Sequence, residues 1–381
     1  MTRKAVLLGT LAAAGLWCSP VLADINIGVV LSATGPAASL GIPEKNTVEL
    51  MPSTIAGQKV NYIVLDDATD TTTAVKDIKK LISENNVDAV IGSTTVTTLA
   101  MREAAVEAET PIVSMGAPAL LIDPADAKTK WVFKSTQNDR LMVTAIIDNM
   151  KAADIKTVAF IGFADPYGEG WWAEFQKASE AAGITIRASE RYNRVDQSVT
   201  GQIAKILSTK PDAVLIAGSG TPAALPQSEL AKRGYKGRIY QTHGAANPDF
   251  LRVGGKDVEG ALLPVGPILV FEQLDPQNPV RAVAADYVGK YEAKFGPRST
   301  FGGHAWDAYL LIANAVPEAL KKGQPGSVEF RRGLRDGLEH TKNLVGTHGV
   351  FNMSEQDHSG LDGRSRVMVV IRDGKWTVLK P

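Results

Sequence analysis

The chain has 381 residues, with 41 Lys plus Arg against 41 Asp plus Glu, so its formal net charge at pH 7 is zero. Near-neutrality without a basic run argues against nucleic acids and anionic membrane surfaces as partners. The length predicts two domains, and the single cysteine, Cys18, means that a large hydrophobic core rather than disulfides must stabilise them.

The first 23 residues predict a secretory signal peptide. Two basic residues precede an apolar stretch over 5–17, and Val21-Leu22-Ala23 fits a small-x-Ala cleavage pattern. We expect cleavage after Ala23 and export to the periplasm. Lipidation at Cys18 is the alternative, although the residues before it suit lipidation poorly. After residue 23 no apolar run approaches the roughly 18 residues of a membrane span, so we expect none.

Short apolar runs then alternate with amphipathic helices. Strands are predicted at 25–31, 59–67, 87–92, 110–116 and 131–136. A helix is predicted at 71–85, where apolar residues recur at helical spacing. The second half repeats the scheme, with strands at 157–162, 184–190, 211–218 and 238–243 and helices at 169–182, 197–208 and 222–233. Continuously apolar strands that alternate with helices predict an α/β protein with two doubly wound parallel-sheet lobes.

The pattern changes after Pro279. Three helices are predicted, at about 280–295, 304–321 and 327–338, followed by a strand pair within 365–380. Helices that follow two complete lobes suggest that the chain returns to pack on an earlier lobe.

Ligands of such sheets bind beyond the carboxyl ends of the strands. The loops expected there are 31–41, 92–98, 114–121, 162–172, 218–226 and 242–249. The second of these loops holds five hydroxyl residues, Ser93, Thr94, Thr95, Thr97 and Thr98, at the point where a strand passes to a helix. These hydroxyls could cap the helix, or they could help the helix N-terminus to bind an anion.

Several other functions find little support. The sequence GSGTPA at 218–223 matches a dinucleotide fingerprint, but the next strand ends in Thr242-His243 instead of an acid. No GxSxG motif occurs and no cysteine remains after cleavage, so we expect no enzyme. The spacing of His340, His348, Asp357 and His358 fits no metal motif, and neither a metal nor a cofactor is expected. Asp165 and Glu169 are better explained as helix N-terminal residues than as an acid–base pair.

The mature chain resembles the periplasmic substrate-binding proteins of branched-chain amino acid ABC importers, the Leu/Ile/Val-binding type. The segments that carry the resemblance are DINIGVVLSATGPAASLG, VLDDATDTTTAVKDIKKLI, VDAVIGS, TPIVSMGA and DPYGEGWWAEF. The resemblance implies the type I fold, with two lobes joined by three crossings that close on a solute like a hinge. It implies lobes at 24–141 plus 268–345 and at 142–267 plus 346–381, and ABC permease and ATPase subunits as partners. A ligand-binding module of a sensor is the alternative class.

The resemblance also implies where a ligand would bind. Hydroxyls and N–H groups at Ser93, Thr94 and Thr95 would hold its carboxylate, with backbone contacts from Gly116 and Ala117. Tyr167 and Leu40 match positions that cover the ligand from the two lobes. Ser219, on the loop 218–226, and His304, near the cleft-facing late helix, complete the expected site.

The amine half of the family's site does not carry over to this sequence. His243 stands where amino-acid binders have an acid that pairs with the ligand ammonium, and Pro118 interrupts a loop that commonly carries a threonine. A buried ammonium without an anion costs on the order of several kcal/mol. We therefore expect a small carboxylate without an ammonium, either an aromatic acid such as benzoate or a 2-oxo acid. Branched-chain or other hydrophobic amino acids remain the alternative.

Overall fold

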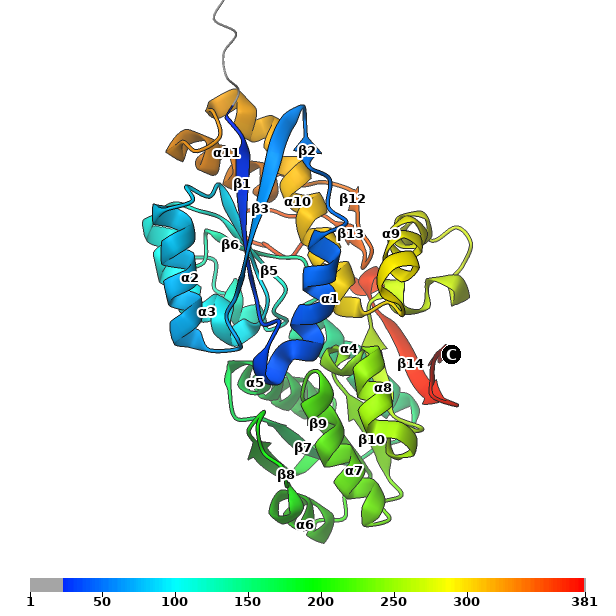
Figure 1. Cartoon of the computed structure of the whole chain (residues 1–381). Helices are drawn as coiled ribbons and strands as arrows, with labels where there is room; N and C mark the ends of the chain where they lie inside the picture. Colours follow the sequence, from blue (N-terminus) through cyan, green and yellow to red (C-terminus); the bar gives the residue numbers. More distant parts are fainter. Residues whose placement is uncertain (1–22, 380–381) are drawn as a thin grey trace, which may run out of the picture.

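A computed structural model describes residues 23–379 of the chain. The expected signal peptide, apart from Ala23, and Cys18 lie outside this range. The described chain forms two lobes, each built around one large sheet, with the first lobe above the second in Figure 1.

The sheet of the first lobe has six strands in the order β2-β3-β1-β4-β5-β6. Its strands are β1 (Ile25–Leu31), β2 (Thr54–Ile55), β3 (Gln58–Asp66), β4 (Ala89–Gly92), β5 (Ile112–Ser114) and β6 (Val132–Lys134). All neighbours pair in parallel except the short edge strand β2, which is antiparallel to β3.

The sheet of the second lobe has seven strands in the order β15-β14-β11-β10-β9-β7-β8. Its strands are β7 (Thr157–Phe163), β8 (Thr185–Tyr192), β9 (Ala213–Ala217), β10 (Arg238–Gln241), β11 (Leu262–Val265), β14 (Val367–Arg372) and β15 (Lys375–Val378). The last two strands form the predicted terminal pair, and β14 joins the sheet antiparallel to β11.

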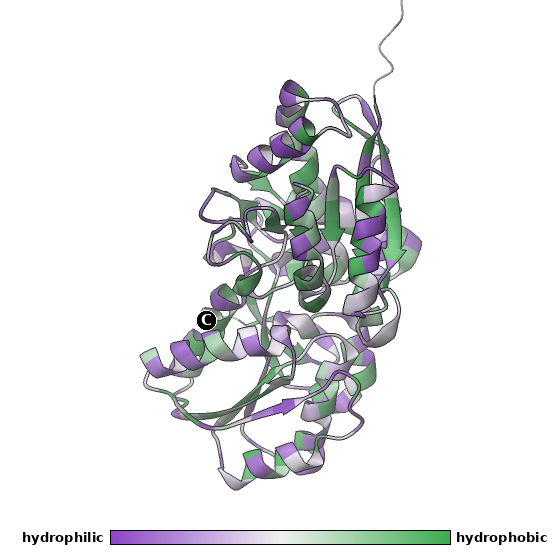
Figure 2. Cartoon of the chain, turned by 90° about the vertical axis from the view of Figure 1, so that its left-hand side faces the viewer, coloured by the Kyte–Doolittle hydropathy of each residue, from purple (hydrophilic) through white to green (hydrophobic). Residues whose placement is uncertain are grey.

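Helices cover both sheets, so the apolar strands lie inside and polar residues face outward (Figure 2). The helices before residue 260 are α1 (Ala38–Val48), α2 (Thr71–Ser83), α3 (Thr95–Glu107), α4 (Asp139–Ala152), α5 (Pro166–Ala181), α6 (Thr200–Ser208), α7 (Ala224–Lys232) and α8 (Pro248–Gly254). The late helices are α9 (Val280–Phe295), α10 (Thr300–Lys322) and α11 (Val328–Glu339). The sequence predictions lacked α1, α4, α8 and β11.

Helix α10 begins at Thr300, four residues before the predicted start. Ser299 caps it, because its hydroxyl accepts a hydrogen bond from the backbone N–H of Phe301 at 3.2 Å. The added turn carries Phe301 and ends at His304, and both residues face the site described below.

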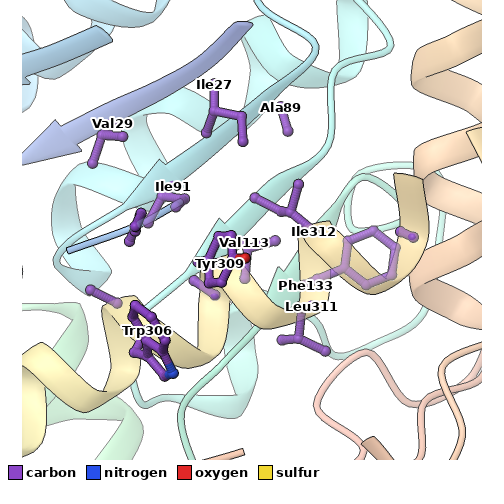
Figure 3. Packing of buried hydrophobic residues seen from close by; sticks show 14 of the residues in the cluster. Ile27, Val29, Ala89, Ile91, Val113, Phe133, Trp306, Tyr309, Leu311 and Ile312 are labelled. Atoms are coloured by element: carbon purple, nitrogen blue, oxygen red, sulfur yellow. The ribbon is translucent and has the colours of Figure 1, made fainter. Parts of the chain in front are cut away.

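The late helices return to the first lobe, as the sequence suggested. Trp306, Tyr309 and Ile312 of α10 pack against Ile91 and Phe133 of the sheet (Figure 3). Burial of one such apolar side chain contributes roughly 1.5–3 kcal/mol, so this contact ties the two distant segments into one core.

The chain crosses between the lobes after β6, after β11 and again before β14. The sequence placed the last boundary at residue 346. However, Phe351 and Met353 are fully buried in the core of the first lobe, and Phe351 belongs to a small sheet made by β12 (Leu344–Val345) and β13 (Val350–Phe351). We therefore place the third crossing between Met353 and Val367.

Candidate functional site

A cavity lies between the lobes at the carboxyl ends of the strands. All ten residues predicted for the ligand site line it: Leu40, Ser93, Thr94, Thr95, Gly116, Ala117, Tyr167, Ser219, His243 and His304. Five further residues complete the lining: Met115, Thr136, Arg194, Gly244 and Phe301. The sequence therefore identified the loops that meet here, although whether each residue contacts a ligand stays a prediction.

The lobes touch directly at one side of the cavity. The backbone N–H of Thr221 in the second lobe donates to Ser39 Oγ in the first lobe at 3.2 Å. Gly220 has φ +63°, and a β-carbon there would lie 2.5 Å from Ser39 Oγ and 2.7 Å from Leu40 Cδ1. Only glycine permits both this backbone conformation and this approach of the lobes.

The hydroxyl residues after β4 have different roles: some make hydrogen bonds within the protein, and one is left unpaired at the cavity. Thr94 is the N-cap of α3, since its hydroxyl accepts from the N–H of Thr97 at 3.4 Å. Thr98 bonds to Ser114 at 2.9 Å, away from any ligand role. Thr95 Oγ1, by contrast, is buried without a hydrogen-bond partner among the described residues. It lies at the positive end of the α3 dipole, where unpaired N–H groups favour an anion.

The neighbouring loop after β5 differs in detail from the expectation. The Gly116 N–H already donates to Ser114 Oγ at 3.1 Å, so it is not a free donor for a ligand carboxylate. The Ala117 carbonyl accepts from the ammonium of Lys134. The Lys134 bond depends on how β6 lies beside the loop, and the Gly116 bond depends on the rotamer of Ser114. The sequence pattern specifies neither.

Two buried histidines, His243 and His304, belong to the lining. His243 Nδ1 and both ring nitrogens of His304 lack hydrogen-bond partners in the part of the chain that the structure describes. Burial, together with the nearby Lys134 and His348, lowers the pKa of His243 to about 3. Burial also holds the pKa of His304 well below its usual range. Both imidazoles are therefore neutral near pH 7, and each offers one donor and one acceptor.

The ring of His304 stacks on the ring of His348, with centroids 3.7 Å apart and an interplanar angle of 18°. His348 Nδ1 lies 3.0 Å from Asp307 Oδ2, and its Nε2 lies 2.9 Å from the Thr300 hydroxyl. These bonds give a structural role to Asp307, a buried acid within α10. It binds a histidine behind the cavity and does not line the cavity itself.

The second-lobe wall combines an aromatic ring with a guanidinium. The Tyr167 hydroxyl bonds to the Thr242 hydroxyl at 2.7 Å, which fixes the ring against the cavity. Arg194 Nε donates to Asp165 Oδ2 at 2.6 Å, and its Nη1 donates to Ser219 Oγ at 3.0 Å. Asp165 is also the N-cap of α5, as predicted. Its carboxylate is thus bound by the N-terminus of α5 and by Arg194, and Asp165 is not among the residues that line the cavity.

Sequence reasoning missed Arg194 because it considered no loop after the strand predicted at 184–190. Yet Arg194 follows β8 just as Tyr167 follows β7, at the carboxyl end of a second-lobe strand. A position directly after a predicted strand was therefore the feature of the sequence that could have identified Arg194. Among the lining residues, Arg194 is the only one with a permanent charge, and none is an Asp or Glu.

Lys134 lies fully buried behind the loop that carries Ala117, and burial lowers its pKa to about 7. In the unfolded chain its pKa returns to about 10.4. Between these values the unfolded state binds the proton and the folded state does not, so the unfolding free energy rises with pH. We expect the melting temperature of the wild type to rise relative to Lys134→Met between about pH 7 and about pH 9.5. Thermal melts of both proteins, with the exposed Lys151→Met as control, test this. A difference that is constant with pH would contradict the assignment.

Two further features bear on function. Within residues 23–379, no three or more His, Cys, Asp or Glu side chains are grouped as a metal site would need. None of the helices in that range has the length and apolar character required to traverse a bilayer.

A family model described as periplasmic binding protein matches residues 24–375. The chain belongs to the periplasmic binding protein family. Its architecture is the type I fold of that family, as predicted. Among curated proteins, it is 24% identical to Leu/Ile/Val-binding protein homolog 3 of Brucella melitensis, and the match covers 89% of both chains.

Solved structures agree with this assignment. An extracellular ligand-binding receptor of Rhodopseudomonas palustris HaA2 is 44% identical and superposes with a TM-score of 0.91, covering 94% of this chain and 100% of that chain. A solute-binding protein of an R. palustris ABC transporter, solved with benzoate, has a TM-score of 0.80 at 21% identity, covering 94% and 96%. At that identity the second likeness concerns the fold alone.

Proposed function

We propose that this periplasmic binding protein is the solute-binding component of an ABC importer and that it captures a small carboxylate between its lobes. The preferred ligand is an aromatic acid such as benzoate, with a branched-chain 2-oxo acid second. The observation that carries the proposal is a cavity lined by unpartnered hydroxyl and imidazole groups, with no Asp or Glu among its lining residues.

The charges of the lining favour an anion. The helix end at Thr95 attracts a carboxylate, and Arg194, whose charge is balanced by Asp165, still has N–H groups beyond those bound to Asp165 and Ser219. An amino acid would bring an ammonium into the same space, where it would lose its hydration and find no anionic partner. Neutral histidines can accept a hydrogen bond from an ammonium, but they cannot neutralise its charge.

The apolar part of the lining suits a flat ring. Leu40, Met115 and Phe301 enter from the first lobe, and Tyr167 enters from the second. A ring between these side chains would gain burial and contact with aromatic faces. The benzoate complex of the R. palustris protein shows that this fold can hold such an acid, although it says nothing about individual residues here.

The remaining parts of the proposal follow from family membership. The protein would be exported to the periplasm after cleavage behind Ala23, would carry out no chemistry on its ligand, and would deliver it to a permease driven by ATPase subunits. Branched-chain amino acid transport is the second candidate, because the curated relative is named for Leu, Ile and Val.

The experiment is a thermal-shift series on the protein without residues 1–23, with benzoate, 4-methyl-2-oxopentanoate and leucine. A ligand that binds only the native state at a hundredfold excess over its Kd adds about 2.7 kcal/mol to the unfolding free energy. We expect the largest shift with benzoate, a smaller one with the oxo acid and none with leucine. A shift with leucine alone would overturn the proposed ligand but would not affect the assignment of the chain to its family.

A further inference from the structure

Glu44 lies on α1 and contacts Ser93 of the hydroxyl cluster that follows β4. Glu44 is only 1% exposed to solvent. Its Oε2 lies 2.6 Å from Ser93 Oγ, and its Oε1 has no hydrogen-bond partner among residues 23–379. Over the same range, no Lys, Arg or His side chain forms an ion pair with it. Ser93, in turn, is 2% exposed and lines the cavity.

These surroundings determine whether the carboxyl group of Glu44 is ionised or neutral. An ionised carboxylate in this position would have one hydroxyl for a partner and no counter-charge, which costs several kcal/mol. The neutral acid avoids that cost. Burial raises the pKa of Glu44 well above its usual range, and the nearby Asp67 raises it further, in agreement with the geometry.

Only one hydrogen can lie between Glu44 Oε2 and Ser93 Oγ. If Glu44 were ionised, Ser93 would have to supply that hydrogen and would present lone pairs to the cavity. A neutral Glu44 carries its proton on Oε2, because a proton on the unpartnered Oε1 would be a buried donor without an acceptor. Glu44 then supplies the hydrogen, and the hydrogen of Ser93 is free to point into the cavity. Chains of this kind also polarise the second hydroxyl, which makes it a stronger donor.

We propose that Glu44 is a positioning residue: as a neutral acid it donates to Ser93 Oγ and so turns the Ser93 hydroxyl into a donor for the ligand carboxylate. This role rests on the proposed function, since it assumes a carboxylate in the cavity. A Ser93 hydroxyl held as a donor makes the site selective, because it binds ligand groups that accept a hydrogen bond more tightly than groups that donate one.

The test measures benzoate affinity by calorimetry for the wild type, Glu44→Gln, Glu44→Met and Ser93→Ala. The amide of Gln can donate to Ser93 as the neutral acid does, so Glu44→Gln should bind within threefold of the wild type. Glu44→Met keeps the length of the side chain but has no donor, and it should bind about fivefold more weakly. Ser93→Ala should lose at least as much. Glu49→Met, at the exposed end of the same helix, is the matched control and should leave the affinity unchanged.

Infrared spectroscopy provides a readout that does not depend on the ligand. The wild type should show the carbonyl band of a neutral carboxylic acid, and Glu44→Gln should lack it. This comparison also decides the question if Glu44→Met does not fold.

Three results would overturn the proposal. The first is wild-type affinity in Glu44→Met, and the second is a gain of tenfold or more in Glu44→Gln, which would mean that the mutation removed a negative charge. The third is an infrared spectrum that Glu44→Gln leaves unchanged. If instead no protein in the series binds benzoate, the proposed ligand fails and the role of Ser93 toward it fails too, while the infrared band still reports the state of Glu44.

Discussion

Replacing His243 with glutamate should weaken benzoate binding at least a hundredfold, which corresponds to about 2.7 kcal/mol. The wild-type imidazole is neutral and buried in the lining of an acid-free cavity. Unlike Glu44, a glutamate at position 243 would have Lys134 nearby and Arg194 in the same lining, and both favour its ionised form. Its carboxylate would repel the carboxylate of the ligand across a medium that screens charge poorly. Calorimetric titration of the variant with benzoate measures the loss.

The matched control is His243→Gln, which keeps a polar, uncharged side chain and should bind benzoate within tenfold of the wild type. The glutamate variant should also be the one in which leucine binding begins, since it restores an anion opposite an ammonium. Equal losses in both variants would mean that the imidazole itself, and not the absence of charge, matters at this position.

Thr95→Val should weaken benzoate binding about tenfold or more, roughly 1.4 kcal/mol, with little change in stability. Valine preserves the shape of the side chain and removes only the hydroxyl, which has no partner within the described protein. A hydroxyl kept unpaired in the folded state is available for a ligand, so its loss should appear in affinity. Calorimetry and thermal melting separate the two effects.

Thr94→Val is the natural comparison, because Thr94 caps α3. Loss of such a cap costs about 1 kcal/mol of unfolding free energy. We expect that variant to melt earlier and to bind benzoate nearly as well as the wild type. If instead Thr94→Val lost affinity and Thr95→Val did not, the roles assigned to these neighbouring residues would have to be exchanged.

The sequence predicted much of this site because its residues follow strands, and strand ends of parallel sheets gather at one edge. Ser93, Tyr167, Ser219 and His243 were all predictable in this way. Phe301 was missed because its helix begins one turn earlier than its apolar pattern suggested.

Hydrogen-bond partners were beyond prediction, both on distant elements and close by in the chain. Glu44 precedes Ser93 by 49 residues and reaches it only through the packing of α1. The N–H of Gly116 was expected to be free, yet Ser114, two residues earlier, accepts it. Period and propensity place a residue on a face of the sheet, but they do not say which group completes its hydrogen bonds.

The contact between Thr221 and Ser39 has a kinetic consequence. If the protein captures a ligand between its lobes as proposed, the ligand would lose contact with one lobe when this hydrogen bond breaks and Leu40 moves away from Gly220. The residence time of that ligand would then be set by how often the lobes part, more than by the strength of any one bond. A membrane partner that held the lobes apart would empty the protein without competing for its pocket.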